Sequence, residues 1–215
     1  MMTKLHWDIL DESRKKLLPK LAFLKEEGFY LAGGTGLALQ IGHRRSLDFD
    51  FYKKDTFSPG DLQNIFVGKF GIDRVKIANI TKNFLRLEIN NIEISFFFYP
   101  YNLVEDLIEI DASYIASIKD IGAMKLIAIV QRGTKRDFVD IYFLIKQFGL
   151  KTLLEAVQIK YPSYNIYIGL QALLYFTDAE KTDEYKNRFD PITKLDWLKI
   201  KKLITKEVFK IQKSL

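Results

Sequence analysis

The chain has 215 residues, a net charge of +6 and 48% apolar residues, which is ordinary for a soluble globular protein. It contains no cysteine and only two histidines, which excludes disulfides, zinc–thiolate sites and cysteine nucleophiles and argues against histidine-based metal sites or catalysis. The positive charge modestly favours anionic partners. The first eight residues lack the apolar segment of a signal peptide, and the longest uncharged run, 161–177, is too polar to span a bilayer. We therefore expect a cytoplasmic protein with no membrane partner.

The first third of the chain predicts a helix followed by two strands. Residues 9–27 carry apolar side chains at helical spacing, and Gly28 is placed to end this helix. A strand is predicted over 29–32 and a second over 47–52. Between them, a Gly-Gly-Thr break is followed by a helical pattern over 37–41.

The next region favours a short helix over 62–70 and then three strands, over 75–80, 84–89 and 92–99. Asn90-Asn91 joins the last two strands, and this pair is typical of a hairpin turn. From Leu103 onward the pattern becomes helical almost without interruption. We therefore predict an α/β (α+β) fold with a mixed-sheet lobe over residues 1–101, a helical lobe over 102–215 packed against it, and the site in the cleft between them.

Apolar and acidic residues alternate strictly from Leu47 to Phe51. Because side chains on a strand have a period of two, Asp48 and Asp50 share one face while the apolar residues pack on the other. Two carboxylates roughly 7 Å apart on one face repel each other, so this placement gains little unless a cation lies between them. Paired acidic oxygens favour Mg²⁺ or Mn²⁺, which completes its shell with water and phosphate oxygens. The alternative is an ordinary exposed strand face.

Adjacent glycines after the first predicted strand indicate a phosphate-binding turn. They let the backbone approach a ligand closely, and the next helix presents its unpaired N–H groups and positive dipole end. A nucleoside triphosphate that bridges this turn and the acidic strand would satisfy both. The candidate nucleotide-binding residues here are Gly33, Gly34, Thr35, Arg44, Arg45 and Ser46. Taken alone, the two glycines also suit an ordinary tight turn.

The order Gly-Gly-Thr, helix, basic turn and Asp-Phe-Asp resembles the signature of nucleotidyltransferases with the DNA polymerase beta-like fold. The string Leu31–Thr35, with Gly42-His43-Arg44 and Asp48-Phe49-Asp50, is similar to the AbiEii/AbiGii toxin branch of that superfamily. The resemblance implies an Mg²⁺-dependent enzyme that moves a nucleoside monophosphate from a nucleoside triphosphate to an acceptor hydroxyl. It further implies a bacterial toxin or phage-defence enzyme, an RNA acceptor with the tRNA 3′ end as one candidate, and a partner antitoxin.

Enzymes of this superfamily usually add one acidic residue from a later strand, and Glu93 is our candidate third metal ligand beside Asp48 and Asp50. On its predicted strand, Glu93 shares a face with Ser95. Many relatives carry the acid nearer the proline, where this chain has Ser95, so the number of metal ions stays open. Glu88 is a weaker substitute, and Glu93 equally suits a solvent-facing position.

A capping box at Ser117–Asp120 begins a predicted helix, and Lys125 is the only charged residue between Ile121 and Val130 of that helix. Lys125 has apolar neighbours one turn away on either side, and a buried lysine costs several kcal/mol unless it is paired. In one interpretation, Lys125 pairs with Asp137 or Asp140 across adjacent helices and locks them together. In the other, Lys125 reaches the triphosphate, and the two aspartates orient it.

Residues 124–144 also resemble the segment of AbiEii-like proteins in which a lysine and a later aspartate are functionally required. Lys125 matches the lysine, whereas Asp137 and Asp140 both remain candidates for the aspartate. The candidate catalytic residues are therefore Asp48, Asp50, Lys125, Asp137 and Asp140.

The last segment, 192–215, carries an apolar and a basic stripe at helical spacing. The apolar residues are Ile200, Ile204, Val208, Ile211 and Leu215, and the basic residues are Lys199, Lys202, Lys206, Lys210 and Lys213. Such a basic run is usually a solvated face. The alternative is a surface that follows a nucleic-acid backbone.

Three functions remain open from the sequence. They are a nucleotidyltransferase toxin acting on RNA, a transferase modifying a small molecule such as an aminoglycoside or a sugar phosphate, and a nucleotide-binding regulator without catalysis. The net charge and the lysine stripe favour RNA over a cationic drug. Because the third carboxylate of the metal site is not assigned, a nucleotide-binding regulator without catalysis remains a candidate.

Overall fold

A computed structural model describes residues 4–181, 190–191 and 195–214 of the chain, with residues 190–191 described by their backbone alone. The first half contains η1 (Trp7–Ile9), α1 (Glu12–Leu17), η2 (Leu18–Leu24), β1 (Tyr30–Leu31), α2 (Gly33–Ile41), β2 (Arg44–Arg45), β3 (Phe49–Lys53), α3 (Pro59–Phe70), η3 (Ile72–Arg74), β4 (Val75–Thr81), β5 (Phe84–Ile89), β6 (Ile92–Phe98), β7 (Ile108–Ile110) and β8 (Ser113–Ile115). The second half contains α4 (Ile118–Gln131), α5 (Lys135–Phe148), α6 (Leu150–Lys160), α7 (Ile166–Leu174), α8 (Thr177–Lys181), β9 (Asp190–Pro191) and α9 (Trp197–Gln212).

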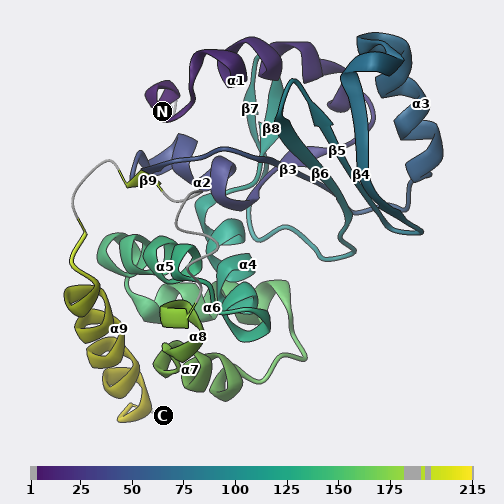
Figure 1. Ribbon diagram of the computed structural model, residues 1–215. Coiled ribbons are helices and arrows are strands. Elements are labelled where there is room, and N and C mark those ends of the chain that lie inside the picture. Colours follow the sequence, from purple (N-terminus) through teal and green to yellow (C-terminus); the bar gives the residue numbers. More distant parts are fainter. Residues whose placement is uncertain (1–3, 182–189, 192–194, 215) are drawn as a thin grey trace.

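A mixed seven-stranded sheet in the order β4-β5-β6-β3-β1-β8-β7 forms the centre of the first half. The N-terminal helices and α3 lie on one side of this sheet, and α4 to α9 gather on the other (Figure 1). Two buried clusters reflect this division, since one joins the N-terminal helices and α3 to the sheet and the other fills the space among α4 to α9. The predicted mixed α/β fold is confirmed.

The hairpin predicted at Asn90-Asn91 is present between β5 and β6, which pair antiparallel up to Ile89 opposite Ile92. Both asparagines have positive φ, 51° and 63°, which is the conformation that a two-residue hairpin turn requires. Strand β6 also pairs parallel with β3, and this register places Ser95 directly opposite Asp50. The two strands that carry the acidic candidates are therefore neighbours.

Two local predictions were wrong. The helix expected over 9–27 is divided into η1, α1 and the 3₁₀ segment η2, because Pro19 has no N–H group with which to continue α1. The helical pattern expected from Leu103 begins only at Ile118. Residues 108–115 instead form the β7–β8 hairpin, which completes the sheet through a parallel pairing of β8 with β1.

A buried ion pair between α4 and α6 holds part of the segment that connects β6 to β7. Lys160 Nζ lies 2.7 Å from Asp120 Oδ1 and donates to the carbonyl of Asn102 at 2.9 Å. Asp120 also accepts from the backbone N–H groups of Val104 and Glu105. The division of the chain into lobes at residue 101 stays a prediction, and the strands of the sheet continue to Ile115.

The C-terminal helix α9 has the two predicted stripes, apart from Leu215, which lies outside the described residues. Ile200, Ile204 and Val208 are buried. The five lysines of the basic stripe are exposed. Over the part of the chain that the structure describes, no helix is both long enough and apolar enough to cross a membrane.

Candidate active site

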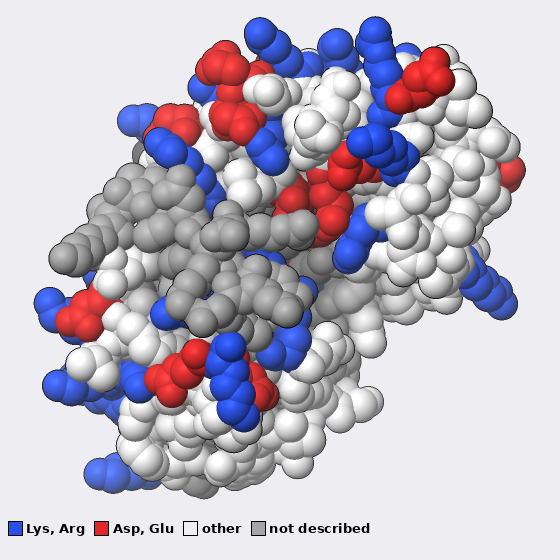
Figure 2. Space-filling model, viewed as in Figure 1, with Lys and Arg blue, Asp and Glu red and all other residues white. Residues whose placement is uncertain are grey.

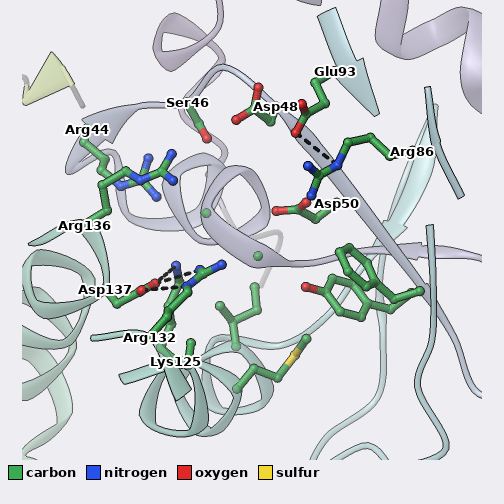
Figure 3. Close-up of a pocket in the computed structure, with 17 residues that line it drawn as sticks. Arg44, Ser46, Asp48, Asp50, Arg86, Glu93, Lys125, Arg132, Arg136 and Asp137 are labelled. Carbon is green, nitrogen blue, oxygen red and sulfur yellow. Dashed lines mark hydrogen bonds and ion pairs between the residues drawn. The ribbon is translucent and has the colours of Figure 1, made fainter. Parts of the chain in front are cut away.

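The acidic strand presents both of its aspartates to one cavity. Phe49 and Phe51 of β3 are buried in the core, whereas Asp48 and Asp50 line a cavity of about 220 Å³ (Figure 3). Strand β3 begins at Phe49, so Leu47 and Asp48, which were expected on the strand, immediately precede it, and the predicted alternation holds from Phe49 to Phe51. Burial raises the pKa of Asp50, and the nearby charge of Asp48 raises it further. The two carboxylates therefore repel each other.

The glycine turn lies against the same cavity, because β1 leads directly into α2. The N–H of Ala32 donates to the carbonyl of Asp50 at 3.0 Å, which fixes the turn beside β3. Gly33 has a φ of +59°, and a Cβ there would overlap the Asp50 carboxylate. A Cβ at Gly34 would overlap the guanidinium of Arg44. Only glycine allows these two charged side chains to approach the start of the helix so closely.

The remaining nucleotide-binding candidates occupy different places. Thr35 is buried behind the cavity, where its hydroxyl bonds Ser46 Oγ at 2.7 Å and the carbonyl of Asp48. Thr35 therefore holds the loop that carries Asp48. Ser46 and Arg44 line the cavity, whereas Arg45 is exposed and lies outside its lining.

Cations from the helical half form the opposite wall. Lys125 of α4, Arg132 at the end of α4 and Arg136 of α5 all line the cavity (Figure 3). Lys125 Nζ lies 3.0 Å from Asp137 Oδ1 and 2.7 Å from Asp140 Oδ2. The pairing expected with one of the aspartates is thus present with both, while Lys125 also faces the cavity.

Asp137 and Asp140 are fully buried and anchor this basic wall. Asp137 accepts from Arg132 Nε at 2.9 Å and from Thr134 Oγ1 at 2.6 Å, in addition to Lys125. Burial alone would raise the pKa of Asp137, but Lys125 and Arg132 outweigh burial and hold that pKa below its ordinary value. Asp137 lines the cavity and Asp140 lies behind it.

Asp140 joins the basic turn after α2 to α5. Arg44 donates to it twice, through Nε at 2.7 Å and Nη2 at 3.1 Å. His43 Nε2 lies 2.6 Å from the same carboxylate. Burial raises the pKa of Asp140, but the positive charges of Arg44 and Lys125 outweigh burial and hold it well below the usual range. Two buried aspartates therefore position the cations of the cavity.

Glu93 lines the cavity beside Asp48 and lies 3.5 Å from Arg86 Nε (Figure 3). Ser95 is buried and accepts a hydrogen bond from Arg86 at 3.3 Å. Glu88 pairs with Lys76 outside the cavity. In residues 4–181 and 195–214, no three carboxylate or histidine groups lie together in a way that could hold a metal ion. Glu93 thus shares the cavity with the two aspartates without forming a ready-made cluster.

Arg86, Arg132 and Arg136 were not among the predicted site residues, although all three line the cavity. Arg132 and Arg136 lie at the turn between α4 and α5. The run Arg-Gly-Thr-Lys-Arg there indicates a basic segment, but it does not predict which way the side chains point. Arg86 reaches the site through the pairing of β5 with β6. Figure 2 shows that, on one face of the molecule, acidic side chains gather beside basic ones near the junction of the two halves.

Two solved structures with a similar fold are described as nucleotidyltransferases. A putative nucleotidyltransferase from Helicobacter pylori matches with a TM-score of 0.57 and 19% identity, covering 94% of this chain and 99% of that chain. MenT4, a nucleotidyltransferase toxin from Mycobacterium tuberculosis H37Rv, matches with a TM-score of 0.52 and 12% identity, covering 90% and 80%. The fold is that of the polymerase beta-like nucleotidyltransferases, as the sequence predicted.

The family model described as "Nucleotidyl transferase AbiEii toxin, Type IV TA system" matches residues 17–210. An uncharacterised protein of Aquifex aeolicus (strain VF5) is 40% identical over 159 residues, which span 71% of this chain and 76% of the relative. The chain therefore belongs to the AbiEii nucleotidyltransferase toxin family of toxin–antitoxin systems. The predicted family and enzyme class are confirmed.

Proposed function

We propose that this enzyme moves a nucleoside monophosphate from a nucleoside triphosphate to a hydroxyl group of RNA, with Asp48 and Asp50 holding Mg²⁺ or Mn²⁺. One observation carries the proposal. The start of α2, Asp48 and Asp50 at the start of β3, and the cations of α4 and α5 all face a single cavity. The three groups match the three needs of nucleotidyl transfer, which are phosphate binding, metal binding and charge neutralisation.

The outer phosphates fit at the start of α2. Gly33 and Gly34 line the cavity there, where unpaired backbone N–H groups and the helix dipole attract anions. Arg44 is held against this turn by Asp140, and Arg136 lines the cavity as well. Because Arg44 is already paired, it presents a preorganised charge that needs no reorientation when the phosphates bind.

The metal fits the carboxylates at the start of β3. Asp48 and Asp50 supply the hard oxygen ligands that Mg²⁺ prefers. Burial and the nearby charge of Asp48 both raise the pKa of Asp50, and a bound cation would relieve the repulsion between the two carboxylates. Glu93, on the neighbouring strand, is the third carboxylate that lines the cavity. When bound, the metal supplies positive charge at the entering and departing oxygens.

The chain's own residues handle the rest of the reaction. The acceptor hydroxyl loses its proton to water as its oxygen forms a bond to the α-phosphorus, the bond to the α–β bridging oxygen breaks, and pyrophosphate leaves with the electron pair. Lys125 and Arg132 neutralise the charge that develops on the departing group. Asp137 keeps both cations in place, since it accepts hydrogen bonds from Lys125 at 3.0 Å and Arg132 at 2.9 Å.

The charge distribution supports an anionic acceptor such as RNA over a cationic drug. The cavity lining contains five basic side chains, Arg44, Arg86, Lys125, Arg132 and Arg136, against four acidic ones, Asp48, Asp50, Glu93 and Asp137. The five exposed lysines of α9 add a basic surface outside the cavity. Membership of a toxin–antitoxin family supports a cognate antitoxin that restrains the activity.

The test incubates the protein with Mg²⁺, each α-labelled nucleoside triphosphate in turn, and either total RNA or a panel of aminoglycosides and sugar phosphates. Label that moves to RNA supports the proposal, and tRNA among the labelled species would identify the acceptor. Label that moves to a small molecule would identify that molecule, in place of RNA, as the acceptor. Binding of nucleotide without transfer to any acceptor would contradict the proposal and favour a regulator.

A further inference from the structure

A second depression opens from the active-site cavity and differs from it in chemistry. It has a volume of about 680 Å³ and shares Tyr52, Phe97, Met124, Ala128 and Arg132 with the smaller cavity. Tyr99, Tyr101 and Tyr161 extend its wall. We call this depression the aromatic groove. The mechanism described above uses none of its aromatic residues.

The aromatic rings of the groove form a continuous wall. Tyr52 and Phe97 are stacked with ring centroids 4.8 Å apart and planes 15° from parallel. Tyr99 packs edge-on against Tyr52 at 5.2 Å, and Tyr101 in turn packs against both Tyr99 and Tyr161. Tyr101 remains 42% exposed. The wall therefore begins at the edge of the active-site cavity and leads away from it toward solvent.

Strand geometry explains why this wall lies beside the carboxylates. Tyr52 follows Asp50 by two residues on β3, and Phe97 follows Ser95 by two residues on β6, so each ring shares a strand face with a polar site position. The register pairs Tyr52 with Phe97, two positions beyond the pair of Asp50 with Ser95. The same face of the sheet thus changes from acidic to aromatic within two residues.

We propose that the aromatic groove binds the nucleobase of the nucleoside triphosphate, by stacking on the wall that begins at Phe97 and Tyr52. This inference rests on the proposed function, because it assumes that the triphosphate occupies the neighbouring cavity. That cavity, at about 220 Å³, is smaller than the roughly 300–1,000 Å³ of pockets that enclose a drug-sized ligand. The nucleoside is covalently joined to the phosphates, so it must lie in a space continuous with the cavity. The groove provides that space and has a suitable size.

The chemistry of the groove suits a base better than it suits a phosphate or a sugar alone. Nucleobases stack on aromatic side chains and on arginine planes, and Arg132 lies where the groove meets the cavity. Burial raises the pKa of Tyr99 to about 12, so its phenol remains neutral beside an anionic nucleotide. Gln131 and Ser163 contribute polar groups to the wall that could contact the edge of a base.

The experiment compares a triphosphate chain with and without an attached nucleoside. Equilibrium binding of inorganic tripolyphosphate and of the four nucleoside triphosphates, each with a non-cleavable methylene bridge between the α and β phosphorus atoms, is measured with Mg²⁺ present. The wild type should bind at least one nucleotide more tightly than tripolyphosphate. Phe97→Ala should weaken nucleotide binding by about 5- to 100-fold, the contribution of one stacked ring, and leave tripolyphosphate binding unchanged. Phe97→Tyr, which keeps a ring, should stay within a few-fold of the wild type.

Phe209→Ala is the matched control, since Phe209 is 51% exposed on α9 and lies outside the groove. It should change neither affinity. Retained tripolyphosphate binding also shows that a groove variant is folded. Equal affinities of nucleotide and tripolyphosphate in the wild type, or an equal loss of both in Phe97→Ala, would overturn the nucleobase site. A wild type that binds neither ligand would instead overturn the proposed function.

Discussion

Arg44 Nε donates a 2.7 Å hydrogen bond to Asp140 Oδ1, joining two residues that lie 96 positions apart in the chain. A second bond from Nη2 makes the contact bidentate, and both side chains are buried. Arg44 follows α2 and Asp140 belongs to α5. The basic turn after α2 and the helical wall of the cavity are therefore fixed to each other by one ion pair.

Replacing Asp140 should destabilise the protein in a pH-dependent way. Asp140→Asn leaves Arg44 without its buried counter-charge and Lys125 with Asp137 as its remaining partner, which costs about 3–5 kcal/mol in unfolding free energy at neutral pH. The folded-state pKa of Asp140 lies below its unfolded value of about 3.9, so its ionised form stabilises the fold above that pH, and this contribution is lost as the pH falls toward the folded pKa. The difference in unfolding free energy between wild type and variant, measured by urea unfolding, should be constant from about pH 5 to about pH 7 and should become smaller below about pH 4.

Asp106→Asn provides the matched control, because Asp106 is exposed. It should leave the unfolding free energy almost unchanged at every pH. A gap for Asp140→Asn that widens on acidification would contradict the assignment of an ionised Asp140 in the folded state.

Lys125 can be tested for a role beyond pairing with the two aspartates. Lys125→Met should weaken tripolyphosphate binding and lower the rate of nucleotidyl transfer by about 10²- to 10³-fold, as expected when a preorganised donor to developing charge is removed. The measurements are equilibrium binding and single-turnover transfer under conditions where the variant is folded.

Lys160→Met is the matched comparison, since Lys160 is also a buried lysine paired with an aspartate but lies outside the cavity. It should lower stability and leave tripolyphosphate affinity unchanged. If both lysine variants lose stability and neither loses phosphate affinity, the purely structural interpretation of Lys125 holds.

The sequence predicted those parts of the site that a local pattern defines. The alternation from Leu47 to Phe51 predicted that Asp48 and Asp50 face the same way, and both line the cavity although β3 begins only at Phe49. The asparagine pair correctly placed the hairpin that brings Glu93 onto the neighbouring strand. Lys125 stood out because it was a single charge on an apolar helix surface, and it does face the cavity.

The missing parts depend on contacts between distant segments. Arg86 enters the site because β5 pairs with β6, and no periodicity within β5 distinguishes it from a surface arginine. The β7–β8 hairpin was mistaken for helix because its short strands carry little alternation and are stabilised by pairing with β1, which lies about 80 residues earlier in the chain. Thr35 was expected to contact phosphate, yet its buried hydroxyl bonds the loop of Asp48.

The ionised Asp50 carboxylate should lower the folding stability at neutral pH and should bind the metal ion. Its folded-state pKa is raised, so the neutral carboxyl stabilises the fold at low pH, and that stability is lost as the pH rises through the folded pKa. Asp50→Asn should therefore be more stable than the wild type at neutral pH without metal. Adding Mg²⁺ should raise the melting temperature of the wild type and leave that of the variant unchanged. An equal Mg²⁺ effect on both proteins would remove Asp50 from the metal site.

Glu93 and Glu88 offer a direct test of the third carboxylate, because they are register partners on β6 and β5 and only Glu93 lines the cavity. Glu93→Gln should lower the transfer rate by about 10²-fold or more, the range expected when a carboxylate acting in the transition state is lost. Glu88→Gln, the same chemical change on the adjacent strand, should stay near the wild-type rate. Similar rates for the two variants would show that Asp48 and Asp50 suffice.

The most direct measurement of the central claim follows separate labels on the α- and γ-phosphates of one nucleoside triphosphate. The wild type with Mg²⁺ and an RNA acceptor should transfer the α label to RNA and release the γ label as pyrophosphate. Asp48→Asn should do neither, while it unfolds with the same cooperativity as the wild type. Transfer of the γ label to RNA, or an unchanged rate of α transfer in Asp48→Asn, would contradict nucleotidyl transfer at Asp48 and Asp50.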